Sequence, residues 1–291
     1  MGAAVVAAVL AAAFLHAVWN ALAHNIRDTL AGFVLICIAD TVCAAAIVAV
    51  VGLPAPRAWP FIVVSAVLEV LYFLALLQAY RLGEFGQMYP IARGTSPWVV
   101  ALVATTVLGQ PLAPAELVGV LVISAGLIGL AFASSDGRSA SSRAGGLPGR
   151  AQVPALAAAL GTGVLIASYT IVDGVGVRRS GDVLAYIGWI FLLQAPVLPA
   201  FALARHGRAL PGRLRPFWIR GLVGGVLSML AYGLVVWAQS RGALAPIAAL
   251  RETSIVIATI IGTLIFKERF GRVRLVASTA VVVGILLLNL T

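Results

Sequence analysis

Charged side chains interrupt several long apolar stretches of this sequence. They are Asp40, Glu69, Arg93, Arg251 and Glu252, and each lies well inside a stretch long enough to form an apolar helix. An Asp, Lys or Arg at the centre of a membrane helix costs about 2.5 to 3.5 kcal/mol on insertion scales, so such residues usually face a cavity or a partner. These five residues are therefore the first candidates for binding or proton transfer.

The two arginines occupy equivalent positions in an internal repeat. A shift of 158 residues lays one set of residues on another, namely Arg93, Thr95, Ser96, Gln110 and Gly126 on Arg251, Thr253, Ser254, Glu268 and Gly284. Two guanidiniums related in this way are expected near the membrane midplane, where they could hold a carboxylate, phosphonate or phosphate through bidentate hydrogen bonds. This predicts an anionic or zwitterionic substrate. In the alternative interpretation, Arg93 pairs with Glu69, and Arg251 pairs with Asp40 or another acid, only to hold the helices together.

The carboxyl groups are candidates for a coupling proton. Glu252 cannot simply neutralise Arg251 on one helix face, because adjacent helical residues point about 100° apart. It needs another partner or a proton. Glu69, Glu252 and Asp40 are therefore predicted to bind and release a proton, since a low-dielectric cavity disfavours an ionised carboxyl. Permanently paired carboxylates are the alternative.

Further polar and aromatic residues complete the predicted binding site. His16 and Asn20 lie four residues apart, on one face of the first predicted helix. We expect them to line the cavity with Tyr89, Tyr169 and Trp237, although an interfacial aromatic belt or plain packing would explain the same residues. Other candidates on the same helices are Tyr72, Gln78, Tyr232 and Gln239. Pro90 and Pro246 would either kink their helices or start them.

Composition shows what must position these residues. Of 291 residues, 62% are hydrophobic and 10% are charged, against roughly 45–50% and 25% in soluble domains. The net charge of +10 is spread over short gaps between apolar runs, which is typical of membrane loops and argues against a nucleic-acid partner. The sequence has no HExxH, GxSxG, P-loop or GxGxxG motif, so we predict no enzyme, cofactor or metal site. Cys37 and Cys43 are expected to pack rather than form a disulfide.

An apolar helix needs about 20 residues to cross the hydrocarbon core. Runs of that length predict ten spans, near 3–23, 29–51, 59–80, 86–108, 114–133, 153–172, 183–204, 217–239, 243–266 and 273–290. Residues 134–152 read as a linker between a first repeat, 1–133, and a second, 153–291. Because each repeat has an odd number of spans, the prediction is an all-α integral membrane protein of ten transmembrane helices, built as two inverted five-helix repeats. Loop charge favours both termini outside the cell.

The repeated pattern resembles a known family. A proline-containing helix, a short turn and a final helix with a central glycine occur over 90–126 and again over 246–284. This is similar to the paired EamA-type repeat of the drug/metabolite transporter superfamily, and the segments 89–94 and 169–174 look like those of a bacterial subgroup. The resemblance implies a cavity lined mainly by helices one, three, four, six, eight and nine, and transport of metabolites or drugs, commonly as export. The family usually has Glu where this chain has Gln110, whereas the second copy keeps Glu268.

The predicted function is therefore a secondary transporter in the inner or plasma membrane. It would export a small anionic or zwitterionic metabolite or drug by alternating access, with proton coupling as a further hypothesis. Its expected partners are that substrate and the lipid bilayer, with no obligate protein partner. The alternative is a membrane receptor or assembly subunit that uses the same scaffold without transporting anything.

Overall fold

The first half of the chain forms long helices. The computed structural model describes residues 1–24, 26, 28–83, 85–133, 153–266 and 272–289, and this part of the chain contains helices and turns but no strand. Apolar stretches fold as helices because a helix satisfies its own backbone hydrogen bonds, which lipid cannot do. The long helices of this half are α1 (Ala3–His24), α2 (Thr29–Val51), α3 (Trp59–Leu82), α4 (Phe85–Thr106) and α5 (Pro114–Ala133), with a short 3-10 helix, η1 (Pro56–Ala58), before α3.

The second half is divided into more pieces. Its helices are α6 (Val153–Ser180), α7 (Val183–Gln194), α8 (Val197–His206), η2 (Gly207–Ala209), α9 (Leu210–Leu214), η3 (Arg215–Phe217), α10 (Trp218–Gln239), α11 (Leu244–Arg251), α12 (Thr253–Phe266) and α13 (Arg272–Asn289). The prediction of single helices over 183–204 and 243–266 was wrong. Pro196, which lacks a backbone donor, separates α7 from α8, and the chain turns at Glu252 between α11 and α12.

The sixth predicted span was too short. It ended at Val172, whereas α6 continues to Ser180. The glycines beyond Asp173 do not end the helix, because they provide room for neighbouring side chains: a Cβ at Gly174 would meet Leu244, and one at Gly176 would meet Tyr186. Asp173 is therefore inside a helix and buried.

Several helices are suited to a bilayer. Within the described residues, five apolar stretches are long and hydrophobic enough to cross a membrane by length and composition, and they are Ala3–Leu22, Leu30–Val51, Pro56–Ala79, Val153–Ser180 and Val183–Gln239. Shorter apolar helices cover Pro114–Leu130 and Leu275–Leu288. The predicted span 86–108 lies on α4, which is less apolar because it contains Arg93 and two prolines. Neither proline interrupts α4, and Pro246 lies in the first turn of α11.

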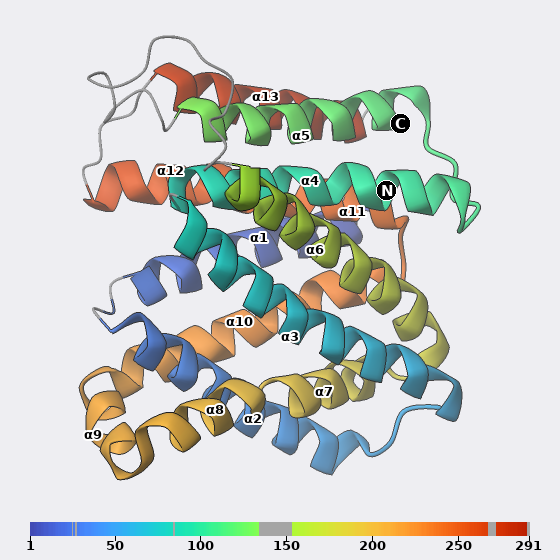
Figure 1. Cartoon of the computed structure of the whole chain (residues 1–291). Coiled ribbons are helices and arrows are strands. Elements are labelled where there is room, and N and C mark those ends of the chain that lie inside the picture. Colours follow the sequence, from blue (N-terminus) through green and yellow to red (C-terminus); the bar gives the residue numbers. More distant parts are fainter. Residues whose placement is uncertain (25, 27, 84, 134–152, 267–271, 290–291) are drawn as a thin grey trace.

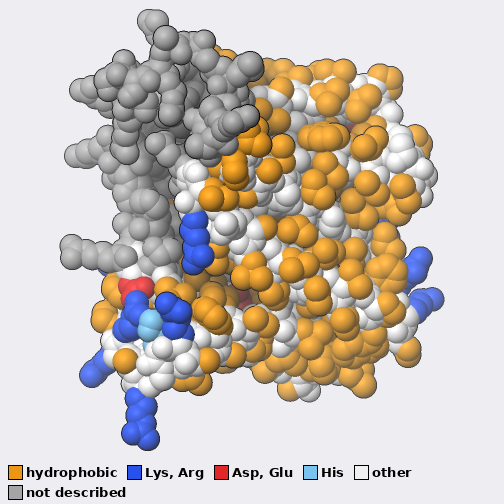
Figure 2. All heavy atoms as spheres, in the orientation of Figure 1, with side chains coloured by type: hydrophobic (Ala, Val, Ile, Leu, Met, Phe, Trp, Pro, Cys, Tyr) orange, Lys and Arg blue, Asp and Glu red, His pale blue; other side chains and the backbone are white. Residues whose placement is uncertain are grey.

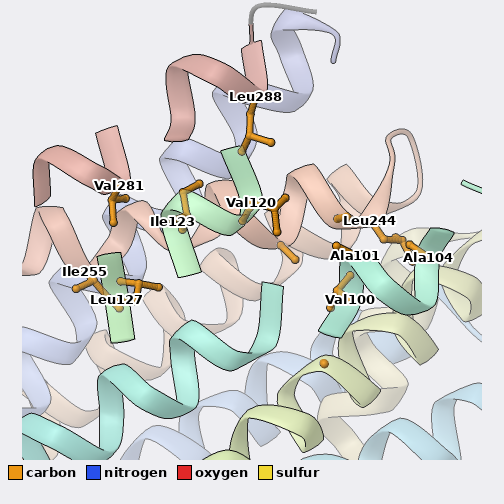
Figure 3. Close-up of a cluster of buried hydrophobic side chains, with 14 of the residues drawn as sticks. Val100, Ala101, Ala104, Val120, Ile123, Leu127, Leu244, Ile255, Val281 and Leu288 are labelled. Atoms are coloured by element: carbon orange, nitrogen blue, oxygen red, sulfur yellow. The ribbon is translucent and has the colours of Figure 1, made fainter. Parts of the chain in front are cut away.

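The helices pack in layers around a buried interior. In Figure 1, α5 and α13 lie together at the top, and α2, α7 and α8 lie at the bottom. Extensive contacts join α5 to α13, α3 to α6 and α1 to α10. Figure 3 shows one apolar cluster, to which α4, α5 and α11 to α13 contribute, with Ile123, Leu127, Leu244 and Val281 among its members.

Small residues allow the closest helix pairs to meet. An ideal Cβ at Gly284 would lie 2.8 Å from the carbonyl oxygen of Gly119, so α13 and α5 approach almost backbone to backbone. A Cβ at Gly225 would lie 2.5 Å from Cβ of Ala39, where α10 crosses α2. Small residues at these crossings let the helix backbones approach closely.

The outer surface is apolar. Figure 2 shows hydrophobic side chains over most of one face, with Lys and Arg gathered at its two ends. Large apolar residues are exposed on several helices, for example Val42, Leu74, Leu102, Phe201 and Leu286. A soluble protein rarely exposes so much contiguous apolar surface. The arrangement is that of a multi-pass membrane protein whose lipid-facing belt lies between two charged ends.

Candidate functional site

Arg93 forms a buried ion pair with the second half of the chain. Its Nε lies 2.8 Å from Oε2 of Glu252, and the two residues are 4% and 0% exposed. The N–H does not point at the oxygen well enough for a hydrogen bond, so we describe the contact as an ion pair. Nη2 of Arg93 also donates to Oγ of Ser254 at 3.2 Å. These contacts tie α4 to the junction of α11 and α12.

Glu252 lies at a break in its helix. Its backbone N–H donates to the carbonyl of Ala249, and its own carbonyl accepts from Ile255, so both bonds span three residues rather than four. The chain therefore tightens for one turn between α11 and α12. Discontinuous helices frame the substrate and ion sites of many transporters, and here the break coincides with the buried charges.

Arg251 is the least satisfied of these residues. It is 8% exposed, and its Nε lies 3.7 Å from Oε1 of Glu252. Among the described residues, neither its Nε nor its Nη2 has a hydrogen-bond partner. Arg93, Arg251, Glu252 and Ser254 are called the guanidinium cluster below. Two guanidiniums share one carboxylate there, so the group has a surplus positive charge in a buried position.

A second buried group consists of acids and tyrosines. The hydroxyl of Tyr232 on α10 lies 2.7 Å from Oε1 of Glu69 on α3 and 2.6 Å from Oδ2 of Asp173 on α6. The hydroxyl of Tyr186 on α7 donates to Oδ1 of Asp173 at 3.2 Å. Glu69 and Asp173 are both buried. Glu69, Asp173, Tyr186 and Tyr232 are called the carboxyl cluster below.

Tyrosines connect the two clusters. Tyr169 on α6 is close enough to interact electrostatically with both arginines and with both acids, Glu69 and Asp173. Its ring centroid lies 5.8 Å from that of Tyr72 on α3. On the other side, the guanidinium carbon of Arg93 lies 5.9 Å from the centroid of the Tyr89 ring. Aromatic side chains thus lie near buried groups of both charge signs.

The predicted polar residues of α1 lie beside the guanidinium cluster. His16 is close enough to interact electrostatically with Arg93 and Arg251. Its ring accepts a hydrogen bond from Nε1 of Trp19 at 3.3 Å, and its carbonyl accepts one from the side chain of Asn20 at 2.7 Å. The structure therefore brings His16 toward the arginines, whereas Asn20 bonds within its own helix.

Other candidates lie elsewhere. Trp237 packs with an apolar cluster of α1, α10 and α11, and the guanidinium carbon of Arg241 lies 4.6 Å from its ring centroid. Asp40 on α2 is buried, and it interacts electrostatically with Glu69 rather than with an arginine. Gln239 is buried at the end of α10, where its carbonyl accepts from Arg178. Gln78 is exposed on α3.

The predicted pairing of Arg93 with Glu69 was wrong. Arg93 pairs with Glu252 and not with Glu69, whose carboxyl instead contacts Tyr232. The inference that Glu252 needs a partner besides Arg251 is confirmed by this same pair. Asp173 was missed as a site residue, because the predicted sixth span ended just before it. If the predicted helix had been continued through the glycines, Asp173 would have been placed inside the membrane, where an ionisable residue is a candidate for function.

Comparison with known proteins defines the family. Residues 153–290 match the model of the EamA-like transporter family. This match covers the second half of the chain, which resembles the EamA-like transporter family. This family is part of the drug/metabolite transporter superfamily, so the predicted resemblance is confirmed. Its members are membrane transporters rather than enzymes, and the buried clusters described above lie in a scaffold of that kind.

Solved structures confirm the fold of this EamA-like chain. One protein of known crystal structure covers 100% of this chain and 98% of its own, with a TM-score of 0.76 and 18% sequence identity. At that identity the likeness concerns the fold alone. No curated protein matches the sequence.

The family's turn residue has a structural role here. Oε1 of Gln110, which follows α4, accepts a hydrogen bond from the backbone N–H of Leu244 at 3.1 Å. Gln110 therefore caps the first turn of α11. A glutamate could accept the same bond, so this contact requires an oxygen rather than a charge. Its repeat equivalent, Glu268, lies outside the described residues.

Proposed function

We propose that this EamA-like protein is a secondary transporter that exports a small anionic or zwitterionic metabolite or drug by alternating access. It would reside in the inner or plasma membrane as ten transmembrane helices, with residues 1–133 and 153–291 as inverted repeats joined by a linker. Loop charge favours both termini outside. The motion would be a rocking of the repeats about the buried clusters, with the free energy supplied by a gradient.

The packing of the helices supports the repeat proposal. If the two halves are equivalent, α1 corresponds to α6, α3 to α10, α4 to α11 with α12, and α5 to α13. Replacing each helix of a packed pair by its counterpart should then give another packed pair. The contact of α3 with α6 becomes that of α10 with α1, and both are extensive. The contact of α4 with α6 becomes that of α1 with α11 and α12, and these helices also pack together. The pair α5 and α13 is exchanged with itself.

The observation that carries the proposal is the unsatisfied guanidinium of Arg251. A buried charge that lacks hydrogen bonds is costly, and here two nitrogens of Arg251, Nε and Nη2, lack partners among the described residues, beside an ion pair at a helix break. An anionic group of a substrate would satisfy both. A guanidinium binds carboxylates and phosphates bidentately, so the cluster is suited to either of these groups.

Transport in proteoliposomes tests this proposal. A substrate would be found by comparing metabolites of cells with and without the protein, and then assayed with purified protein under an imposed pH gradient. We expect Arg251→Gln to weaken substrate binding about tenfold to a hundredfold, which is the value of one or two charged hydrogen bonds. Arg93→Gln should be impaired as well. The exposed Arg208→Gln serves as the matched control.

Two results would count against the proposal. Unchanged rate and KM in both buried variants would exclude the arginines from the substrate site. If the wild-type protein moves none of a broad panel of anions and zwitterions, the non-transporting receptor becomes the better interpretation.

A further inference from the structure

The hydroxyl of Tyr232 has one hydrogen atom for two carboxyl groups. Its oxygen lies 2.7 Å from Oε1 of Glu69 and 2.6 Å from Oδ2 of Asp173. Both distances are those of O–H···O hydrogen bonds. A tyrosine can donate only once, so one contact must be a donation to the phenol oxygen. The donor can only be a protonated carboxyl.

The remaining contacts indicate which carboxyl has the proton. Asp173 accepts from Tyr186 through Oδ1, while its Oδ2 lies beside Tyr232. A carboxyl flanked by two hydroxyl donors is suited to the ionised form. Tyr232 then donates to Asp173, and a protonated Glu69 donates to the phenol oxygen of Tyr232. The chain of bonds runs from Glu69 through Tyr232 to Asp173.

Two polar groups near the cluster have hydrogen-bonding atoms without a partner among the described residues. The hydroxyl of Ser65 is fully buried beside Asp173, and it makes no hydrogen bond of good geometry with the described residues. Asp40 on α2 is 5% exposed, acts electrostatically on Glu69, and has an Oδ1 without a partner in the described structure.

The remaining titratable or polar neighbours come from three elements. Tyr169 is on α6, Gln194 ends α7 and approaches Glu69, and Arg251 ends α11 and acts on Asp173. Two buried carboxylates with a third acid nearby would repel one another strongly. A proton on one of them removes that repulsion.

We propose that Glu69, Tyr232 and Asp173 form a binding site for a single exchangeable proton, with Glu69 as its carrier. As a coupling site, it rests on the proposed transport function. On release, the O–H bond of Glu69 breaks and the proton passes to water on the open side of the protein. Glu69 is left as a carboxylate, while Tyr232 keeps its hydrogen bond to Asp173. The site combines α3 of the first half with α6 and α10 of the second, so a rocking motion of the halves would open and close it.

The position of the site suggests how it is coupled to the substrate. Tyr169 interacts electrostatically with the charged groups of both clusters, so a molecule bound beside it could place one end toward the guanidiniums and the other toward the carboxyls. A zwitterion would place its anionic group on Arg251 and its cationic group on Glu69. The cation and the proton would then compete for the same carboxyl. Such competition yields exchange, which drives export when protons flow inward.

Infrared difference spectroscopy of the full-length protein in lipid nanodiscs tests the site without any substrate. At neutral pH, the wild-type spectrum should contain the C=O stretching band of a buried protonated carboxyl. Glu69→Gln should lose this band, and Tyr232→Phe should shift it. Asp182→Asn is the matched control, because Asp182 is an exposed carboxyl that caps α7, and asparagine caps a helix equally well. Its spectrum should keep the band.

The same variants separate coupling from transport. In proteoliposomes, Glu69→Gln should raise the KM for substrate, because the cationic group of the substrate loses its carboxylate, and the transport that remains should no longer respond to an imposed pH gradient. If the spectrum of Glu69→Gln at neutral pH keeps the C=O band of the protonated carboxyl, as that of Asp182→Asn should, Glu69 is not the proton carrier and the proposed site is overturned. The proton site is also overturned if the wild-type spectrum lacks the C=O band of a protonated carboxyl. If the carboxylate bands of that spectrum shift when potassium replaces sodium, the cluster is a sodium site instead. If the wild-type protein moves no substrate, the transport proposal fails, while the spectra still decide on the proton.

Discussion

The guanidinium and carboxyl clusters are both buried between the two halves of the protein, yet they balance charge differently. In the first, two arginines share Glu252, and Arg251 keeps unpaired donors toward the interior. In the second, two acids share the hydroxyl of Tyr232. The first cluster therefore needs an anion, and the second needs a proton. A buried site with a surplus charge of either sign is suited to reversible binding of a ligand of the opposite charge.

The clusters also differ in their relation to the internal repeat. The shift of 158 residues relates the two arginines within the matching segments 93–126 and 251–284. The guanidinium cluster thus has residues from equivalent positions, whereas the acids of the carboxyl cluster, Glu69 and Asp173, lie outside these segments and are not matched to each other. A transporter that alternates between two equivalent conformations is expected to bind its substrate at residues from equivalent positions of the two repeats. An asymmetric proton site could favour one direction over the other.

Glu252→Gln should break the first cluster and have the largest effect. It leaves two buried guanidiniums without a negative charge, and removing one partner of a buried ion pair typically costs about 3 to 5 kcal/mol. We expect a much lower free energy of unfolding, measured by denaturant titration in detergent micelles. Glu116→Gln is the control, because Glu116 accepts one backbone bond at the start of α5 and glutamine can do the same. Equal stability of the two variants would show that Glu252 does not neutralise the arginines.

Tyr232→Phe should weaken the second cluster to a smaller extent. Removing the hydroxyl leaves one oxygen of each acid unsatisfied, and a buried polar group without a partner costs about 1 to 3 kcal/mol. Tyr186→Phe is the matched comparison, since Tyr186 makes a single, longer contact with Asp173. Equilibrium unfolding should therefore rank Tyr232→Phe below Tyr186→Phe in stability. The reverse order would mean that the shared hydroxyl does not organise the cluster.

The sequence predicted the guanidinium cluster better than the carboxyl cluster for a physical reason. Arg93 and Arg251 were found because repetition marks equivalent positions, and most helix limits followed from apolar length. Asp173 was missed because glycines usually weaken a helix, whereas in α6 they admit the side chains of neighbouring helices. The sequence also could not assign Arg93 to Glu252, because helical periodicity gives the face of a side chain and not the helix that it meets.

The break at Glu252 was equally hidden. Pro90 and Pro246 were predicted either to kink their helices or to start them, and Pro246 indeed lies in the first turn of α11, while α4 continues through Pro90. The helix instead turns where the carboxylate of Glu252 meets Arg93 from another helix. The break thus coincides with a tertiary contact and not with a residue of low helix propensity. The sequence alone does not show such contacts, because they depend on how the helices pack together.

An exposed ion pair provides the contrast for both buried clusters. Nη2 of Arg213 on α9 lies 2.7 Å from Oδ2 of Asp28, with 40% and 26% of the two side chains exposed. The hydrogen bond from Arg213 lowers the pKa of the Asp28 carboxyl below its ordinary value. Because the folded-state pKa is the lower one, the pair stabilises the protein above the ordinary carboxyl pKa of about 3.9. That contribution disappears as the pH falls through the lowered pKa.

Asp28→Asn measures this smallest effect. Asparagine still caps α2 as Asp28 does through its bond to Ala31, so the variant removes the charge while keeping the cap. We expect a loss of about 0.2 to 1 kcal/mol at neutral pH, as for other exposed pairs. Unfolding titrations of both proteins across the acid range should show the difference shrinking to nothing as the carboxyl becomes protonated. If the loss of stability persists in acid, its cause is a weaker helix cap rather than the lost charge. If the loss is as large as that of Glu252→Gln, buried and exposed charges do not differ in their contribution to stability.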